Sequence, residues 1–407
     1  MEPEKRAQPH HPIAAASTSR WSDLAREAAE QLRAQDRWRV IRTLADTGVR
    51  SRLADGRAVV QFASNDYFGL SEHPAVIEAA IAATRRWGTG AGASRLVVGS
   101  RPIHDDLEAA LADWKHAEAA LLFATGYAAN VGVMVALARL GAALGAPIGI
   151  VSDELNHASI IDGIRLSAAP FNIYAHADAE AARQRVVEHL DAGRRPVIVT
   201  DSVFSMDGDL APLGDLAQLA AETSALLVID DAHAVFAGCG ADLVASARSR
   251  GGAEIVVVGT LSKSLGSLGG FVAGRTALVD WCRNTSRSFI FSTATPPGVA
   301  AAALAALEVL QGAEGVELTA KLRRNVDVLA PAQASAVVPV VVGTAERALE
   351  WSDKLLERSM FVPAIRPPTV PEGSSRLRVA VSARHATGDL EALREALADL
   401  RRLDPTT

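Results

Sequence analysis

The segment ALLVIDDAH, residues 225–233, places a run of apolar residues directly before two aspartates and a histidine. Similar runs, rich in β-branched and apolar residues, occur at EAALLF (118–123), PIGIVSD (147–153), FNIYAH (171–176), PVIVTDSVFS (196–205) and AEIVVVGTLS (253–262). Helical patterns lie between these runs. Strands that alternate with helices favour a mostly parallel α/β sheet covered on both faces, and right-handed crossovers make the sheet doubly wound.

The rest of the chain extends this α/β core on both sides. A chain of 407 residues favours two domains. We predict a disordered tail over residues 1–20, an N-terminal helical arm over 21–60, a large α/β domain over 61–295 and a smaller α+β domain over 296–407. The helical pattern of the arm runs from about Trp21 to Leu44.

The composition excludes several classes of function. The net charge of −6 argues against the strongly basic surface that nucleic-acid-binding proteins carry. The two cysteines, Cys239 and Cys282, form no CxxC pair, which argues against a metal site or a disulfide framework and favours a cytoplasmic protein. No uncharged apolar run approaches about 18 residues, so we expect no membrane span.

Polar residues end five of the predicted strands, where an open α/β sheet binds its ligands. They are Thr125, Gly126 and Tyr127; Asn156 and His157; Asp201, Ser202 and Ser205; Asp230, Asp231 and His233; and Thr260, Ser262 and Lys263. Taken singly, each has an ordinary alternative, because strand-end aspartates often cap helices or form turns and loop lysines are often solvated.

Two nucleotide-binding motifs fail at these positions. A P-loop needs glycine immediately before its lysine, whereas Ser262 precedes Lys263. The segment GTGAGAS (88–94) follows a helical pattern rather than a strand, so it does not match the dinucleotide fingerprint. A strand-end Asp, a nearby His and a Lys flanked by hydroxyls instead suit pyridoxal 5'-phosphate. This cofactor needs a lysine amine, a carboxylate for its ring nitrogen, and phosphate ligands at a helix N-terminus.

Seven motifs resemble those of the α-oxoamine synthases, a family of fold-type I pyridoxal-phosphate enzymes. The similarity extends from about Trp21 to Leu403. The motifs are SNDYFGL (64–70), SRLVVGS (94–100) followed by H and LE, LNHASIIDG (155–163), VFSMDGDLAPL (203–213), DDAH (230–233), TLSKSLGSLGG (260–270) and IRPPTVPEGSSRLRVAVSA (365–383).

The resemblance implies a role for each residue of the cofactor site. Lys263 is expected to bind the cofactor covalently and later to take the Cα proton, while Asp230 pairs with the ring nitrogen. His233 and Ser205 are expected near the phenolic oxygen, and His157 is expected to stack on the ring face away from Lys263. The phosphate ligands expected from this chain are Gly126, Tyr127 and Thr260, with Ser292 and Thr293 reaching the phosphate from a neighbouring subunit of a homodimer.

The resemblance also implies the substrate-binding residues. Arg378 is expected to hold the amino-acid carboxylate in a bidentate contact, with Asn65 nearby. Ser94 stands where glycine-specific relatives have threonine, which leaves room for the methyl group of L-alanine. Arg39 is the best match to an arginine that contacts the acyl group, although Arg37 and Arg42 compete for that role.

The expected enzyme is a pyridoxal-phosphate-dependent C-acyltransferase. Within the family, the chain is most similar to the branch that condenses L-alanine with a pimeloyl thioester, bound to CoA or a carrier protein, to give 8-amino-7-oxononanoate, carbon dioxide and free thiol for biotin synthesis. One segment departs from the family: after DDAH, residues 234–238 read AVFAG where the family carries a glycine-rich turn. A sibling synthase with another acyl donor therefore remains an alternative, as does a non-catalytic partner subunit of the same fold.

Overall fold

The structure is a computed structural model that describes residues 20–236, 242, 245–246 and 252–404. Most of the predicted tail, residues 1–19, lies outside this range. The chain divides into two compact units, Met1–Arg42 and Thr43–Thr407. The predicted boundary at residue 295 falls inside the second unit and stays a prediction.

The first unit contains one helix, α1 (Trp21–Ala34), among its described residues. The helix predicted to continue to about Leu44 ends ten residues earlier. Asp36 adopts the left-handed conformation with φ of 53°, and the N–H of Arg37 donates to the carbonyl oxygen of Leu32 at 2.8 Å. This arrangement satisfies carbonyl groups of the last helical turn and stops the helix.

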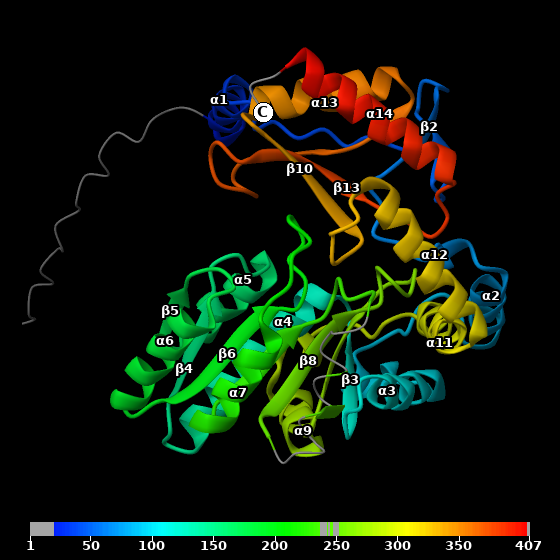
Figure 1. The fold of residues 1–407 in the computed structure, drawn as a ribbon. Coiled ribbons are helices and arrows are strands. Elements are labelled where there is room, and N and C mark those ends of the chain that lie inside the picture. The colour runs from blue at the N-terminus through cyan, green and yellow to red at the C-terminus, as the bar shows by residue number, and fades with distance from the viewer. Residues whose placement is uncertain (1–19, 237–241, 243–244, 247–251, 405–407) are drawn as a thin grey trace, which may run out of the picture. The chain divides into compact units, whose positions relative to one another are not determined.

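The second unit is built on a seven-stranded sheet (Figure 1). In spatial order its strands are β3 (Ala119–Phe123), β9 (Gly270–Gly274), β8 (Glu254–Thr260), β7 (Leu226–Asp230), β6 (Arg195–Asp201), β4 (Ile148–Asp153) and β5 (Phe171–Tyr174). The predicted mostly parallel sheet is confirmed. The exception is β9, which is antiparallel to both neighbours. The sequence did not predict β9, because its GFVAG segment contains two glycines and is too short to show an alternation.

Alternate residues of the buried strands face two layers of helices. One face packs against α4 (Gly126–Ala143), α5 (Ala158–Ser167), α9 (Thr276–Thr285) and α10 (Arg287–Ile290). The other face packs against α6 (Ala179–Asp191), α7 (Leu213–Thr223) and α3 (Pro102–Trp114). On β7, Val228 belongs to the first face and Leu227 and Ile229 to the second. Both faces are thus covered, as predicted.

The elements outside the large sheet and its covering helices form smaller sheets and further helices, most of them in the C-terminal part of the chain. A three-stranded antiparallel sheet has the order β10 (Val337–Gly343), β13 (Ser375–Ala380) and β12 (Ala364–Ile365). A second small sheet joins β1 (Arg50–Arg52), β2 (Ala58–Gln61) and β11 (Met360–Phe361). Further helices among the described residues are α2 (Pro74–Trp87), α11 (Pro297–Gln311), α12 (Ala313–Leu329), α13 (Ala345–Glu357) and α14 (Thr387–Leu403), together with the short η1 (Leu70–Glu72) and η2 (Arg95–Gly99).

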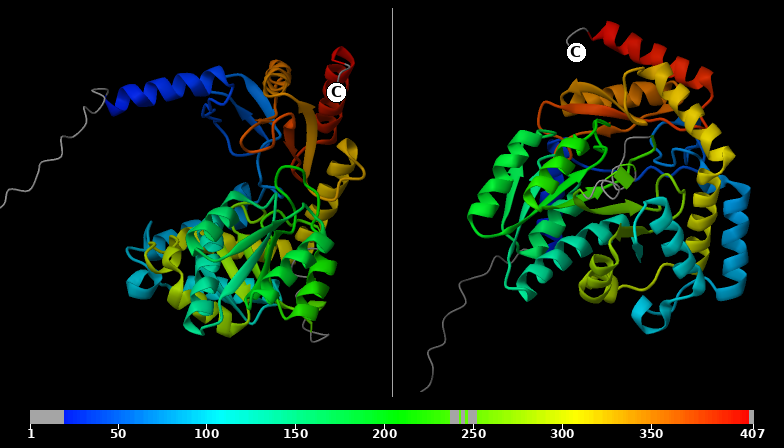
Figure 2. Two further views of the ribbon diagram at one scale, coloured as in Figure 1. Left: turned by 90° about the vertical axis from the view of Figure 1, so that its left-hand side faces the viewer. Right: turned by 60° about the horizontal axis from the view of Figure 1, so that its bottom comes forward.

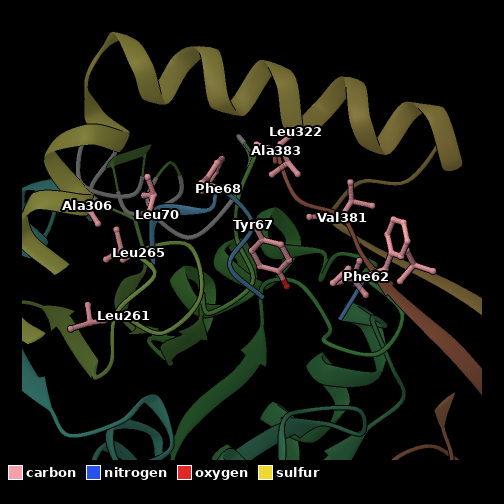
Figure 3. Close-up of a cluster of buried hydrophobic side chains, with 14 of the residues drawn as sticks. Phe62, Tyr67, Phe68, Leu70, Leu261, Leu265, Ala306, Leu322, Val381 and Ala383 are labelled. Carbon is pink, nitrogen blue, oxygen red and sulfur yellow. The ribbon is translucent and has the colours of Figure 1, made fainter. Parts of the chain in front are cut away.

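A hydrophobic cluster connects this C-terminal part to segments before the large sheet. Helices α2 and α11 lie side by side (Figure 2). Phe62, Tyr67 and Leu70 pack in the same cluster as Leu322 and Val381 (Figure 3). Tyr67, Phe68 and Leu70 of the SNDYFGL segment are therefore buried against elements from the C-terminal part of the second unit.

Within the described residues, α4 has the length and hydropathy of a membrane span, and a second span would need α11 and α12 to act together despite a bend of 78°. Helix α4 packs against α5, α9 and the sheet. Its apolar composition is accounted for by these contacts.

Candidate functional site

The polar residues that end β6, β7 and β8 lie beside one another. Asp201 and Asp230 are partners in the parallel register of β6 and β7, and Asp230 faces Val258 of β8. The Asp230 carboxylate is buried, accepting hydrogen bonds from Nδ2 of Asn130 at 2.6 Å and from the N–H of Ala232 at 3.0 Å. These bonds fix the direction of a carboxylate at the centre of the sheet edge.

Lys263 lies in the turn after β8 and contacts the histidine that follows β7. Its Nζ is 2.8 Å from Nε2 of His233. Burial lowers the pKa of Lys263 to about 8, against the opposing effect of the Asp230 and Asp201 carboxylates. Burial also lowers the pKa of His233 well below its ordinary value, and the charge of Lys263 lowers it further. A neutral imidazole thus faces an amine that loses its proton far more readily than an exposed lysine.

His157 caps the N-terminus of α5 beside the same carboxylates. Its N–H donates to Oδ2 of Asp201 at 2.9 Å, and its Nδ1 is 2.7 Å from Oγ of Ser159. Asn130 donates to that same Oγ at 2.9 Å and thereby links His157 to Asp230. Burial lowers the pKa of His157 and raises that of Asp201 well above its usual range.

The N-terminus of α4 lies next to the strand ends. Thr125 caps the helix by accepting a hydrogen bond from the N–H of Ala128 at 3.0 Å. The N–H groups of Gly126 and Tyr127 precede the first intrahelical bond and are directed out of the helix, as in an anion-binding N-terminus. Space there is tight, because a Cβ on Gly270 would lie 2.4 Å from the nitrogen of Gly126.

Thr260 and Tyr127, which are expected to bind the phosphate, form hydrogen bonds to other residues of the chain in this structure. Oγ1 of Thr260 is 2.8 Å from Oγ of Ser262 and donates to the carbonyl oxygen of Gly269 at 3.1 Å. The hydroxyl of Tyr127 donates to Asp162. Both residues flank the α4 N-terminus, since a Cβ on Gly126 would approach Cβ of Thr260 to 3.3 Å.

Arg378 enters the site from a different sheet. It lies on β13, where Nε donates to the carbonyl oxygen of Ser205 at 2.5 Å and Nη2 donates to Oδ1 of Asn65 at 3.1 Å. The structure therefore brings Arg378 into contact with Asn65, the pair that the resemblance implied, and places the carbonyl group of Ser205 beside them.

Four further candidates lie outside this hydrogen-bonded group or in a separate unit. Arg39 belongs to the unit Met1–Arg42, so its role stays a prediction. The carbonyl oxygen of Ser94 accepts from the N–H groups of Val97 and Gly99, which sets the start of η2. Ser292 and Thr293 lie after α10, and the N–H of Ala294 donates to the carbonyl oxygen of Ala93 at 3.0 Å, next to Ser94. Their predicted reach into a second subunit stays a prediction.

Sequence reasoning missed two residues and one contact that hold the others in place. The residues are Asn130 and Tyr67, whose hydroxyl oxygen is 2.7 Å from Nδ1 of His233, and the contact joins Asp201 to the N–H of His157. Asn130 lies three residues after Tyr127, at the end of the segment ATGYAAN (124–130), and Tyr67 lies within the motif SNDYFGL, so the signal was present in the sequence. Their partners are distant in the chain, however, and local patterns do not reveal such pairs.

The segment after DDAH is described as far as Phe236. Val235 and Phe236 pack against the hydrophobic cluster of the C-terminal part, and Cζ of Arg323 lies 5.1 Å from the centre of the Phe236 ring. The rest of the departing segment, residues 237–238, lies outside the described residues. Bulky side chains thus anchor the turn that presents His233.

The described residues contain no group of three or more His, Cys, Asp or Glu side chains arranged to hold a metal ion.

Comparisons with known proteins identify the family and the fold. The model of the family "Aminotransferase class I and II" matches residues 57–397. An 8-amino-7-oxononanoate synthase from Geobacter sulfurreducens is 44% identical over 387 residues, which make up 91% of this chain and 95% of that protein. A serine palmitoyltransferase solved with pyridoxal phosphate has a TM-score of 0.85 at 26% identity, covering 95% of this chain and 99% of that one. The crystal structure of an 8-amino-7-oxononanoate synthase from Francisella tularensis has a TM-score of 0.69 at 23% identity, covering 85% and 99%, and shows a similar fold.

Proposed function

Since the chain belongs to the aminotransferase class I and II family, and within it to the α-oxoamine synthases, we propose that it condenses L-alanine with a pimeloyl thioester. The products are 8-amino-7-oxononanoate, carbon dioxide and the free thiol of CoA or a carrier protein, as needed for biotin synthesis. The enzyme is a pyridoxal-phosphate-dependent C-acyltransferase. The identity of 44% to a synthase of this name over most of both chains supports this assignment.

One structural observation carries the proposal. The Lys263 amine lies 2.8 Å from a neutral histidine, and burial brings its pKa to about 8. Lowering the pKa from 10.5 raises the fraction of neutral amine roughly 300-fold at pH values below both. A lysine that serves as a nucleophile and then as a base needs this property.

The residues around Lys263 fit pyridoxal phosphate. Asp230 offers a buried carboxylate for the ring nitrogen, and its orientation is set by Asn130. The N-terminus of α4 offers the N–H groups of Gly126 and Tyr127 for the phosphate. When bound, the cofactor supplies an electron sink that stabilises negative charge on the substrate Cα.

Three side chains of the protein, Lys263, His233 and Arg378, carry out the other steps. The Lys263 amine binds the cofactor and later accepts the Cα proton. His233 keeps a neutral ring nitrogen next to that amine and is available to donate a hydrogen bond to a developing oxyanion in the acyl steps. Arg378, buried on β13 and directed by Asn65 and the carbonyl of Ser205, binds the alanine carboxylate.

A homodimer with shared sites is part of the proposal. The side chains of Val97 and Val98 on η2 are exposed by 72% and 68%, and Phe291, next to Ser292, is exposed by 70%. A second subunit that covers these apolar side chains would also take Ser292 and Thr293 to its neighbour's phosphate site. Mixing an inactive Lys263→Ala chain with an inactive Thr293 variant should restore part of the activity if the sites are shared, and should restore none if each site is complete within one subunit.

Product mass spectrometry tests the reaction directly. The purified chain is incubated with L-alanine and, separately, acetyl, pimeloyl and palmitoyl thioesters, and glycine and L-serine are then offered in place of alanine. We expect 8-amino-7-oxononanoate with the pimeloyl donor and L-alanine, in preference to the other products. A purified chain that stays colourless after addition of pyridoxal phosphate would contradict the proposal as a whole.

A sibling synthase with a different acyl donor is the second candidate. Val235 and Phe236 fill the position of a glycine-rich turn beside His233, and the serine palmitoyltransferase match has the higher TM-score of the two solved structures. In the same experiment, a long-chain or acetyl product in excess of the pimeloyl product would favour this candidate. A coloured chain that forms no product with any donor would favour a non-catalytic partner subunit.

A further inference from the structure

Tyr67 is a buried tyrosine that the proposed reaction does not use. It has no exposed surface, and it belongs to the same hydrophobic cluster as Phe62 and Val381 (Figure 3). Burial raises the pKa of its hydroxyl, so the phenol stays protonated. Its hydroxyl oxygen lies 2.7 Å from Nδ1 of His233 and 3.2 Å from Oδ1 of Asn65.

These contacts form part of a longer series of hydrogen bonds. Nη2 of Arg378 donates to the same Oδ1 of Asn65, and Nε2 of His233 is 2.8 Å from Nζ of Lys263. The series therefore runs from Arg378, through Asn65, Tyr67 and His233, to Lys263. At one end lies Arg378, the residue proposed to bind the carboxylate of the amino-acid substrate, and at the other end lies the reactive amine of Lys263.

The number of protons limits how the series can be arranged. A protonated Lys263 donates to Nε2 of His233, so the ring proton must lie on Nδ1 and point at the oxygen of Tyr67. Tyr67 then donates to Asn65. A neutral Lys263 can instead accept from Nε2–H, and Tyr67 then donates to Nδ1. The two arrangements differ in the tautomer of His233 and in the direction of the Tyr67–His233 and His233–Lys263 bonds, and Tyr67 donates to Oδ1 of Asn65 only in the first arrangement.

We propose that Tyr67 is a positioning residue that sets the tautomer of His233, and that reversal of its hydrogen bond couples the carboxylate-binding end of the site to the proton on Lys263. The mechanistic meaning of this coupling rests on the proposed function. The reversal of the Tyr67–His233 hydrogen bond involves only residues of this chain, so it can be tested without measuring the reaction.

Other charged groups also face the Lys263–His233 pair, and the direction in which each changes the pKa of Lys263 or His233 is known. Asp230 and Asp201 favour the protonated Lys263, whereas Arg378 opposes it. His157 faces His233 as well. These groups are unchanged when only the Tyr67 hydroxyl is removed, so a Tyr67→Phe variant isolates the proposed bond.

Two measurements on the full-length, cofactor-free chain test the proposal. Nitrogen-15 NMR of selectively labelled histidine reports which ring nitrogen of His233 carries the proton. The pH dependence of acetylation of Lys263 by acetic anhydride, read by peptide mass spectrometry with exposed Lys321 as an internal reference, gives the pKa of the amine. In the wild-type chain we expect the Nδ1–H tautomer below the Lys263 pKa of about 8 and a change toward Nε2–H above it.

In Tyr67→Phe, His233 is expected to keep the Nε2–H tautomer throughout, because an Nδ1–H would be buried without an acceptor. The pKa of Lys263 should then fall by at least about one unit, since its ammonium loses a hydrogen-bond acceptor. Tyr174→Phe is the matched control, since Tyr174 is also fully buried but lies on the edge strand β5. It should change neither measurement.

A second variant keeps the test decisive if Tyr67→Phe does not fold. Asn65→Leu removes the acceptor that Tyr67 uses in the first arrangement, so it should also hold His233 as Nε2–H. An unchanged tautomer and an unchanged Lys263 pKa in the variant that folds would overturn the proposal, as would an equal response in Tyr174→Phe. Failure of the proposed reaction would appear separately, in the product analysis.

Discussion

Two consecutive aspartates at the end of β7 are each close to a lysine, one buried (Lys115) and one half-buried (Lys263), and the two lysines differ in their partners. Asp231 accepts a hydrogen bond from Nζ of Lys115 at 2.7 Å, in an ion pair whose side chains are exposed by 3% and 0%. Asp230 is held instead by Asn130, and Lys263 contacts the neutral His233. A buried lysine bound to a carboxylate stabilises the fold, whereas a half-buried lysine next to an imidazole, without a carboxylate in direct contact, is free to react.

Removal of the reactive lysine should have the largest effect. Lys263→Ala is expected to reduce product formation by about 10³-fold or more, because nucleophile and base are lost together. The visible absorption of the cofactor-loaded chain should disappear as well. Lys321→Ala, at an exposed position on α12, is the matched control and should retain both. Comparable activity in the two variants would remove the distinction between Lys263 and the other lysines.

Lys115→Met tests the structural side of the comparison. Removing one partner leaves the Asp231 charge buried, which should lower the free energy of unfolding by about 3–5 kcal/mol. Denaturant unfolding measures this loss. Lys354→Met removes an exposed partner of Glu350 and should cost less than about 1 kcal/mol. A Lys115→Met chain with normal stability but no activity would show that Lys115 acts in the reaction rather than in the fold.

The pH dependence of cofactor capture distinguishes the reactive lysine from an ordinary one. The neutral amine is the nucleophile, and the pKa of Lys263 is about 8 instead of 10.5. The rate of absorbance change after mixing with pyridoxal phosphate should therefore rise about 10-fold per pH unit below 8 and level off above it. A rate that continued to rise to pH 10 would indicate that burial does not lower this pKa.

The smallest expected effect concerns the residue that holds Asp230. Asn130→Leu removes the donor 2.6 Å from the Asp230 carboxylate while keeping the side-chain volume similar. We expect the dissociation constant of pyridoxal phosphate to rise by roughly 10-fold, the value of one hydrogen bond to a charged group. Absorbance titration measures this change. Ser159→Ala removes the other acceptor of Asn130 and the hydroxyl partner of His157, but it leaves the bond from Asn130 to Asp230 in place and should have a weaker effect.

The parts of the fold that depend on local patterns were predictable. The six quoted runs became six strands of the large sheet, and Pro74 and the cap at Thr125 start helices as such residues do. Strand β9 was missed, and the arm helix was extended too far. In both cases the outcome depends on a feature that residue patterns record poorly: pairing with distant strands for β9, and a single left-handed residue at Asp36.

The candidate site shows the same division. Asp230, His233 and Lys263 were identifiable because parallel strands end at one edge of a sheet and their sequences end in polar residues. Tyr67 was not, because it meets His233 across 166 positions of the chain. Arg378 was grouped with Asn65 through resemblance to a family, and their contact spans 313 positions.

The sequence by itself determined the alternation of strands and helices and the polar residues at the strand ends, since both follow from periodicity and backbone preference. Only the tertiary structure decided which lysine is paired with a carboxylate and which faces a neutral imidazole. Asp230 and Asp231 are identical in type and adjacent in the chain, but neighbouring residues at a strand end point to opposite faces of the sheet. Burial and the partner found on each face then give one lysine a structural role and the other a reactive amine.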